Sequence, residues 1–364
     1  MRIAFFILVV GHGLLHVLGF AKAFDLFDGT PLTQTISKPF GLVWLLAGIL
    51  FGVVALLFAF KNSAWWWVGF LAVGISQVLI LCFWNDTKFG TIANTIILVA
   101  LIIGYSTARY YRAYQDEVKR GFQQEARLQT SELTESDIRD LPEPIKKYLR
   151  FTGSIGKAKV NNFKTEFTGK IRKDEQSAWM PFTSEQYNFM EMPTRLFFMK
   201  ALMKRLPVAG FHCFKNGSAS MDIRLLSLLK VQYQDGAEMD LSETVTFFND
   251  MCCLAPPTLI DRRIKWLAVE GNQVRASFTH NQLTIFARLY FNEQGKLLNF
   301  VSEDRYSAEA GKQLPWSTPL KDYQTINGYQ LMKNAETIYS YPDRDLCYGT
   351  FQLTRIEYNC TDVH

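Results

Sequence analysis

Two histidines lie in a long apolar stretch near the start of the chain, with a spacing that could support chemistry. His12 and His16 are four residues apart within the run 3–23. On a helix this spacing puts both imidazoles on one face, about 40° apart around the axis. Such a pair can supply two ligands to one metal ion, handle a proton, or hydrogen-bond to neighbouring helices.

Polar residues in the later apolar runs lie at depths that could complete the same site. Gln77 and Asn94 lie within runs, and Asp86 lies between two of them. Polar groups are costly in lipid and tend to face the interior of a bundle. We therefore treat His12, His16, Gln77, Asp86 and Asn94 as a candidate intramembrane polar site. Interhelical hydrogen bonding is the favoured interpretation, and a metal or proton site is the alternative, with Asp86 as a third ligand only if its loop folds inward.

Four apolar runs must position these residues. They cover about 3–23, 40–60, 64–84 and 89–106, and each is close to the roughly 20 residues that a helix needs to cross a bilayer. Tryptophans at both ends of the run 64–84 suit the headgroup layer, where aromatic belts anchor helices. We predict a four-helix transmembrane domain over residues 1–106.

Basic residues around these runs predict the orientation of the chain. Arg2, Lys61 and the arginines at 109 and 112 fall on one side of the predicted membrane domain. The positive-inside rule then places both termini in the cytoplasm. We expect a multi-pass protein of the bacterial inner membrane with a cytoplasmic soluble domain, joined by a helical juxtamembrane linker at 107–130.

Residues 131–364 have the pattern of an α+β domain built on an antiparallel sheet. A helix is expected to start at Thr134, and another at 243–254 with Ser242 as its cap. From 157 onward the hydrophobic period is two, which predicts about nine strands. They are expected at 163–171, 184–192, 194–201, 207–215, 272–280, 282–292, 296–307, 333–341 and 349–358.

Several of these strands carry apolar residues at odd and even positions alike, so the sheet would be apolar on both faces. Each face then needs a cover, which can be a helix, the membrane or an apolar ligand. Ordinary core packing is the favoured interpretation, and a curved sheet around an apolar cavity, which would suit a lipid-like ligand, is the alternative. The candidate ligand-binding residues are Trp179, Phe182, Tyr187, Phe286, Tyr290 and Trp316.

Other features limit the classes of function. The net charge of +5 over 364 residues is too small and too evenly spread for nucleic-acid binding. The six cysteines show no CxxC spacing, and phosphate-loop, GxSxG and HExxH motifs are absent from the sequence. Asp304 and Arg305 are expected in surface ion pairs. Whether the protein is an enzyme stays open, with the sequence leaning against it, and the sequence identifies neither a cofactor nor a metal.

Two groups of motifs resemble a bacterial membrane protein family that is catalogued only as a domain of unknown function. The membrane part carries HGxxHxxGF from His12 and WxDxKFGTxAN from Trp84, and the soluble part carries WxPF from Trp179 and Pro315-Trp316. The resemblance spans most of the chain and implies no activity. At the level of the fold, a helix followed by an aromatic-rich antiparallel sheet is similar to the half-barrel of periplasmic lipoprotein carriers.

Three hypotheses follow. In the first, the soluble domain binds an apolar or lipid-like ligand near the bilayer, with membrane lipid as its partner. In the second, the HxxxH pair serves a membrane-embedded metal, redox or proton-handling protein. In the third, the soluble domain is a membrane-tethered scaffold that docks a protein partner.

Overall fold

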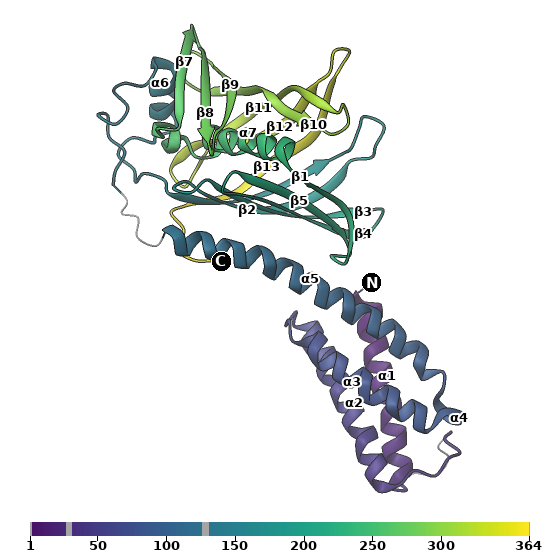
Figure 1. Ribbon diagram of the computed structural model, residues 1–364. Helices are drawn as coiled ribbons and strands as arrows, with labels where there is room; N and C mark the ends of the chain where they lie inside the picture. Colours follow the sequence, from purple (N-terminus) through teal and green to yellow (C-terminus); the bar gives the residue numbers. More distant parts are fainter. Residues whose placement is uncertain (1, 27–30, 126–130, 364) are drawn as a thin grey trace. The chain divides into compact units, whose positions relative to one another are not determined.

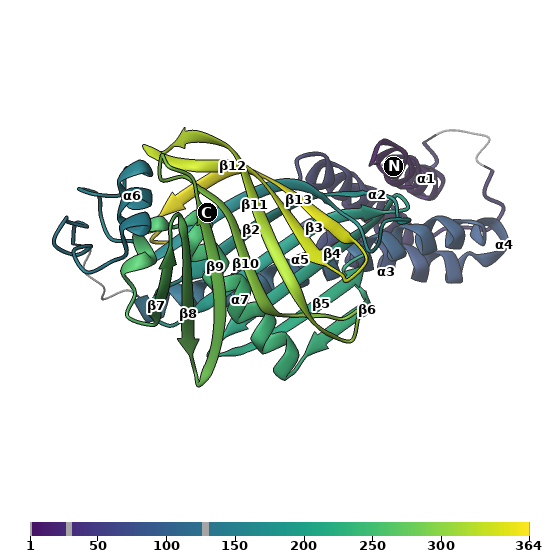
Figure 2. The same ribbon diagram turned by 90° about the horizontal axis from the view of Figure 1, so that it is seen from above.

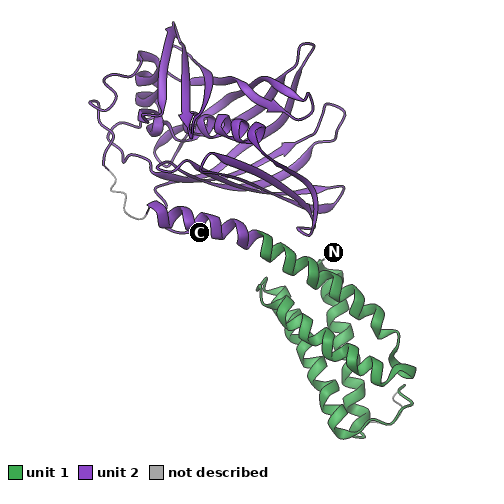
Figure 3. Ribbon diagram, viewed as in Figure 1, with its two compact units in different colours: residues 1–110 green, residues 111–364 purple. Residues whose placement is uncertain are grey.

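The chain forms two units, which differ in secondary structure (Figure 3). The computed structural model describes three stretches of the chain: 2–26, 31–125 and 131–363. The first unit comprises residues 1–110 and its described residues are mainly helical; the second comprises residues 111–364 and is built mainly from strands. The last part of the expected linker, 126–130, lies outside the described residues.

Four helices are long and apolar enough to cross a membrane (Figure 1). They are α1 (Arg2–Ala23), α2 (Lys38–Ala59), α3 (Trp65–Cys82) and α5 (Gly90–Glu125), and the short helix α4 (Trp84–Thr87) lies between the last two. The four helices expected from the apolar runs are therefore confirmed. Helix α5 has 36 residues, because the polar segment after residue 106 continues the apolar helix without a break.

Glycines allow α1 and α2 to approach closely. A Cβ atom added at Gly48 would lie 3.0 Å from the carbonyl oxygen of Gly13, and one added at Gly19 would collide with the indole ring of Trp44. Small residues commonly make such seams between membrane helices. Gly52, four residues after Gly48 on the same helix, does not take part in this contact, because a Cβ atom there would meet nothing within 4 Å.

The second unit is built on one antiparallel sheet of 13 strands. The strands are β1 (Asn162–Ile171), β2 (Met180–Phe189), β3 (Thr194–Met203), β4 (Leu206–Lys215), β5 (Ser218–Leu225), β6 (Leu229–Asp235), β7 (Ile264–Glu270), β8 (Gln273–His280), β9 (Leu283–Phe291), β10 (Leu297–Ser307), β11 (Lys312–Ile326), β12 (Tyr329–Ser340) and β13 (Asp345–Tyr358). The spatial order is β6-β5-β4-β3-β2-β1-β13-β12-β11-β10-β9-β8-β7. The chain thus runs outward from β1 to β6, crosses to the far edge at β7 and returns to β13 beside β1 (Figure 2).

The sheet has more strands than the nine or so expected from the sequence. The additional ones are β5, β6, β7 and β11. Strand β6 escapes the pattern because nearly all of its residues are exposed, so no alternation of apolar and polar residues marks it. Strand β11 contains Pro315 and Pro319, which suggest breaks in a sequence read alone. The predicted fold class, a helical membrane part with a curved antiparallel sheet, is confirmed.

Helix α7 (Ala237–Leu254) lies against the inner, concave face of the sheet (Figures 1 and 2). All residues from 242 to 254 are buried. The helix begins after Gly236, whose φ of 93° suits glycine. The expected start at Ser242 is therefore wrong: this residue lies inside the helix, and its hydroxyl accepts a hydrogen bond from the backbone N–H of Tyr306.

The segment after Thr134 forms hydrogen-bonded turns over 135–140 instead of the expected helix. Asp137 accepts hydrogen bonds from the backbone and hydroxyl of Thr134, and Pro142 ends the segment at once, which leaves no room for helical turns. A short helix, α6 (Glu143–Phe151), follows, and η1 (Pro256–Ile260) later closes the end of α7.

The outer face of the sheet is covered by the second half of α5. The ring of Tyr114 packs 5.3 Å from that of Phe198, and the ring of Phe122 packs 5.7 Å from that of Tyr187. Both apolar faces of this sheet region are thus covered by helices, α7 on the inside and α5 on the outside. This arrangement explains why these strands are apolar at consecutive positions.

Candidate functional site

A cavity of about 270 Å³ lies between α7 and the inner face of the sheet. Its volume is just below the range of roughly 300–1,000 Å³ that is typical of small-molecule sites. More than half of the lining side chains are apolar or aromatic. They are Phe167, Ile171, Phe197, Met199, Met221, Ile223, Cys253, Leu254, Trp316, Met332, Ala335, Tyr348 and Phe351.

A buried arginine, Arg195 on β3, joins the helix to the sheet at one part of the cavity wall. Its Nε donates to Asp250 Oδ2 at 2.8 Å, and its Nη1 donates to Glu243 Oε2 at 3.0 Å. Its Nη2 donates to Gln186 Oε1 at 2.9 Å, and the Gln186 amide in turn donates to Asp250. The positive charge of this arginine is thus satisfied inside the fold.

A second arginine, Arg305 on β10, also reaches α7. Its Nη1 donates to the Ser242 carbonyl oxygen at 2.9 Å, its Nη2 lies 3.9 Å from Glu243 Oε1, and its guanidinium lies 4.6 Å from the centre of the Trp316 ring. The expectation of a surface ion pair with Asp304 is therefore wrong. Neighbouring residues of a strand point to opposite faces, so Arg305 faces the cavity. The Asp304 carboxylate accepts a hydrogen bond from the backbone N–H of Phe286 on β9.

The environment shifts the pKa values of the two α7 carboxyl groups in opposite directions. Burial alone would raise the pKa of Glu243, but the surrounding cations, Arg195 first among them, lower it to about 2. At Asp250 burial outweighs the interaction with Arg195 and raises the pKa. The two arginines balance the two carboxyl groups, so this part of the wall offers no net charge to a ligand.

A third arginine, Arg172, lines the cavity just beyond the end of β1. Its Nε donates to the Cys347 carbonyl oxygen at 2.8 Å, and its guanidinium lies 4.5 Å from the centre of the Trp179 ring. Within the described part of the chain, no carboxylate forms a salt bridge with it. Its charge is therefore available to an anionic group at the cavity wall.

The structure separates the six aromatic residues expected to bind a ligand. Trp316 lines the cavity, and its Nε1 donates to the hydroxyl of Tyr348, a second lining residue. Trp179 contacts Arg172, whereas Phe182 belongs to the apolar core beside the cavity.

The remaining three aromatic residues lie elsewhere. Tyr187 packs against Phe122 of α5 on the outer face. Phe286 is exposed and lies under Arg275, and Tyr290 pairs with Gln273 near the far edge of the sheet.

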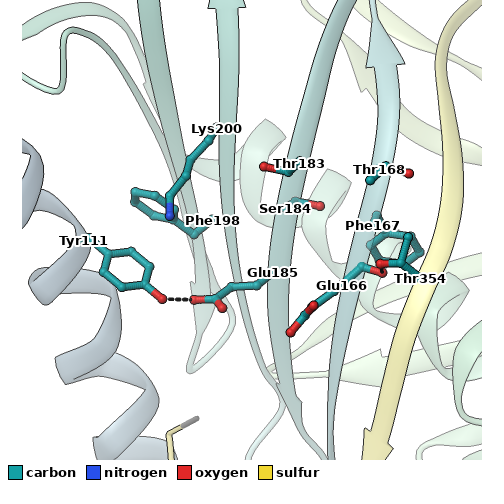
Figure 4. A pocket seen from close by; sticks show the side chains of 10 residues that line it. All are labelled: Tyr111, Glu166, Phe167, Thr168, Thr183, Ser184, Glu185, Phe198, Lys200 and Thr354. Atoms are coloured by element: carbon teal, nitrogen blue, oxygen red, sulfur yellow. Dashed lines mark hydrogen bonds between the residues drawn. The ribbon is translucent and has the colours of Figure 1, made fainter. Parts of the chain in front are cut away.

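The outer face carries a second pocket of about 270 Å³, shown in Figure 4. The Tyr111 hydroxyl donates to Glu185 Oε1 at 2.6 Å, and Lys200 Nζ lies 4.5 Å from the centre of the Tyr111 ring. Lys164, itself buried, lies 3.2 Å from Glu166 Oε1. The two contacts of Tyr111 attach the second half of α5 to strands β2 and β3, whereas the Lys164–Glu166 pair lies within β1.

In the first unit, His12 and His16 join Ser76 and Asn94 in a buried cluster. His12 Nε2 lies 2.9 Å from Asn94 Oδ1 and 3.3 Å from Ser76 Oγ, and His16 Nε2 lies 2.9 Å from the same hydroxyl. The Asn94 amide also donates to Gln77 Oε1 at 3.0 Å. Four of the five expected polar residues are thus brought together, with Ser76 as an additional member.

The hydrogen bonds assign the tautomers of neutral imidazoles in this cluster. His16 Nδ1 lies 2.9 Å from the His12 carbonyl oxygen, so it carries the proton, and His16 Nε2 accepts from Ser76. His12 Nε2 donates to Asn94 Oδ1. His12 Nδ1 is then left as a buried acceptor, with no hydrogen-bond partner in the described part of the chain.

Asp86 lies apart from this cluster. Its carboxylate accepts hydrogen bonds from the backbone N–H groups of Thr33 and Gln34 at 2.7 and 2.8 Å, so it fixes the segment before α2. Within the described residues, no group of three or more His, Cys, Asp or Glu side chains is placed to hold a metal ion.

Sequence reasoning missed Arg172, Arg195, Glu243 and Asp250. These residues lie on β3, on α7 and beyond β1, and they are up to 78 positions apart, between Arg172 and Asp250. The only local signal was acidic residues within a helix that is otherwise apolar enough to be buried.

The fold and the cavity define a protein with four helices able to cross a membrane and a curved-sheet domain with an apolar pocket. Residues 131–351, more than half of the chain, match the family of unknown function DUF6544. The chain belongs to this family. Among curated proteins no significant sequence match is found.

Solved structures with a similar backbone include two bacterial proteins. A LolA superfamily protein from Nitrosomonas europaea has 9% identity and a TM-score of 0.35, over 60% of this chain and 92% of its own. A DUF1329 family protein from Desulfovibrio piger has 10% identity and a TM-score of 0.32, over 59% of this chain and 92% of its own.

Proposed function

We propose that the second unit binds a single-chain amphiphile, with its apolar tail in the cavity and its acidic head group on Arg172. The observation that supports this proposal most directly is the composition of the cavity wall. Its charges balance at Arg195 and Arg305, and one further arginine at the wall, Arg172, has no acidic partner among the residues that the structure describes. An apolar chamber with one available cation suits a fatty acid or a lipid with an acidic head group.

Burial of the tail supplies the driving force, and the head group supplies orientation. Each methylene group moved from water into the cavity contributes about 0.8 kcal/mol. The Arg172 guanidinium is held by Cys347 and by the Trp179 ring, so little side-chain freedom is lost when it binds an anion. An ordered guanidinium also offers several N–H donors in a plane that matches a carboxylate or phosphate.

We further propose that the chain is an inner-membrane protein whose second unit faces the cytoplasm. Four apolar helices support membrane insertion. Arg2, Lys61 and the basic residues after residue 106 support a cytoplasmic location for that unit. A protein tag at residue 364 that is reachable only after the inner membrane is permeabilised would agree with this placement, and one reachable from outside would contradict it.

Titration of the purified full chain with a fluorescent fatty-acid probe tests the binding proposal. Ile223→Trp fills part of the cavity and is expected to abolish binding, whereas Val269→Trp, at an exposed position on β7, is expected to leave it unchanged. Equal binding by the parent and by Ile223→Trp would contradict the proposal.

The head-group assignment has its own test. Arg172→Gln is expected to weaken binding of the fatty acid by about tenfold, the effect of losing one charge-assisted contact. The matching fatty alcohol, which lacks the charge, should bind the parent and this variant equally. A similar loss for both compounds would contradict a role for Arg172 in charge recognition.

A second candidate function concerns the intramembrane cluster. The unpartnered His12 Nδ1 could accept a proton or bind a metal ion, because it presents a lone pair in a buried position. Metal analysis of the intact protein, with His12→Asn as the comparison, tests the metal version. Equal metal content in the parent and the variant would contradict it.

A further inference from the structure

Two neighbouring hairpin turns at one end of the sheet share an unusual surface. The first, the β3–β4 turn, connects Met203 to Leu206; the second, the β5–β6 turn, connects Leu225 to Leu229. They are adjacent, because the backbone N–H of Leu226 donates to the Pro207 carbonyl oxygen at 2.7 Å. We refer to these two turns with their flanking residues, 202–206 and 225–230, as the hairpin tips.

Large apolar side chains are exposed at the hairpin tips. Five of them show between 41% and 56% of their surface to solvent: Leu202, Met203, Leu206, Leu228 and Leu229. Single exposed apolar residues are ordinary, but a group of this kind on adjacent turns is typical of an interaction surface.

Basic side chains accompany these apolar ones. Lys204 and Arg205 form the first turn, and Lys230 follows the second. Within the described residues none of the three forms a salt bridge with an acidic side chain. Exposed apolar residues with basic side chains beside them complement the surface of an anionic bilayer, which attracts Lys and Arg.

The backbone of the tips is unfavourable for the residues that occupy it. Lys204 and Arg205 have φ values of 49° and 69°, and Leu226 and Ser227 have 55° and 56°. Tight hairpins with positive φ favour Asn and Gly. Other hairpins of this sheet follow that preference, with Asn216-Gly217, Asn281-Gln282 and Asn327-Gly328. Lysine, arginine and leucine at the tips are therefore better explained by a contact than by turn stability.

An apolar row on the inner face connects the cavity to the tips. On β3, Met199 lines the cavity and alternation places Ala201 and Met203 on the same face. Val208 lies opposite Ala201 on the neighbouring strand, and Leu206 lies opposite Met203. The row thus runs from the cavity wall to exposed side chains without a charged residue between them.

Arg172 belongs to the same end of the sheet. Gly169, three residues before it, pairs with Phe182, which pairs with Ala201. The same line across the sheet continues through Val208 to Leu225. The available cation at the cavity wall and the hairpin tips therefore lie at the same ends of adjoining strands.

We propose that the hairpin tips bind the surface of an anionic lipid bilayer and that the apolar row guides an amphiphile between this surface and the cavity. The first part stands on the tips alone, and the second rests on the proposed function. The partner is identified by chemistry, as a negatively charged surface with an apolar layer beneath it.

Hydrogen–deuterium exchange of the full chain tests the docking. The chain is placed in phosphatidylcholine nanodiscs, in nanodiscs that also contain phosphatidylglycerol, and in phosphatidylcholine nanodiscs with added phosphatidylglycerol vesicles. Peptides covering 201–207 and 225–231 are expected to exchange at least about tenfold more slowly with phosphatidylglycerol in either arm, because lipid excludes water from the exposed turn amides. No change in either arm would overturn the proposal.

Charge reversal at the tips provides the matched control. Lys204→Glu with Arg205→Glu should remove the protection, whereas Arg262→Glu with Lys265→Glu, at exposed positions by the far edge strand β7, should preserve it. Unchanged exchange in β8 peptides verifies that each variant is folded. Protection that survives reversal at the tips, or that rises with protein concentration in detergent alone, would overturn the proposal; the latter would indicate a second copy as the partner.

The two proposals fail separately. Ile223→Trp should lose the fatty-acid probe yet keep lipid-dependent protection at the tips. If the parent binds the probe but shows no lipid-dependent protection at the tips, the docking alone would be overturned. Protection without any probe binding would overturn the proposed function and the guiding row, and would leave the docking supported.

Discussion

The two buried polar clusters of this protein satisfy the same requirement in different ways. In the helical unit, uncharged side chains around Ser76 share hydrogen bonds, and among its described residues no Asp, Glu, Lys or Arg is buried. In the sheet domain, Arg195 and Arg305 are balanced by two carboxyl groups on α7. Lipid offers no water to screen a charge during insertion, whereas a domain that folds in water can assemble ion pairs between helix and sheet.

The comparison also shows where each cluster is incomplete. Counting the described residues only, the helical cluster leaves His12 Nδ1 without a hydrogen-bond partner, and the cavity leaves Arg172 without a carboxylate. Buried or half-buried polar groups with unused capacity are candidates for ligand contact. The first is an acceptor in an apolar surrounding, and the second is a cation beside an apolar cavity.

The largest expected effect comes from removing the shared cation of the sheet domain. Arg195→Met leaves Glu243 and Asp250 buried without their main partner, which should lower the free energy of unfolding by about 3–5 kcal/mol. Arg355→Met, which removes an exposed pair with Glu357, is the control and should cost about 0–1 kcal/mol. Thermal unfolding of the full chain in detergent measures both; similar losses would contradict the central role of Arg195.

The pH dependence of stability should follow from Glu243. Its pKa is lowered from an ordinary value of 4.5 to about 2 in the fold, so its stabilising contribution is complete above pH 4.5 and is lost as the pH falls toward 2. Asp250, whose pKa is raised, acts in the opposite sense. Glu243→Gln should therefore flatten the decline of the unfolding temperature between pH 4.5 and 2. An equally steep decline in the variant would contradict this assignment.

The close contact between α1 and α2 should tolerate a larger side chain less well than an open helix face does. Gly19→Ala forces a methyl group into the Trp44 ring and should cost about 1–3 kcal/mol. Gly52→Ala has free space and should be neutral or slightly stabilising, because alanine favours helix. The unfolding temperatures of the two variants in detergent compare the sites, and equal values would contradict the close approach.

The smallest expected effect concerns the neutral cluster. Asn94→Leu removes hydrogen bonds to His12, Ser76 and Gln77 and should cost about 0.6–2 kcal/mol, since hydrogen bonds between membrane helices are individually weak. Thr95→Val removes only a bond to the carbonyl of Thr91 on the same helix and serves as the control. Unfolding of both variants in mixed micelles, monitored by circular dichroism, gives the difference.

The sequence predicts the elements of this fold better than its site. Apolar runs of sufficient length define the helices, and period-two patterns define most strands. The pattern fails at β6, which is exposed on both faces, and at β11, where Pro315 and Pro319 interrupt it. These failures are local, because the edge position of β6 and the pairing of β11 are decided by the rest of the sheet.

The two sites differ in how far spacing can predict them. His12 and His16 share a helix face by their interval alone, and the adjoining helices could offer partners only at similar depth. Arg195, Glu243 and Arg305 come together through the crossing of α7 over a curved sheet. The spacing of residues along the chain does not show where α7 crosses the sheet. Arg305 was therefore expected at the surface, although it faces the inside of the domain.

The most direct test of the account is mass spectrometry of the intact purified chain with its bound small molecules. If the cavity binds an amphiphile, the parent protein should carry one acidic single-chain amphiphile per chain, which Val269→Trp should retain and Ile223→Trp should lack. A parent protein that carries no such molecule and takes up none when fatty acid is added would contradict it.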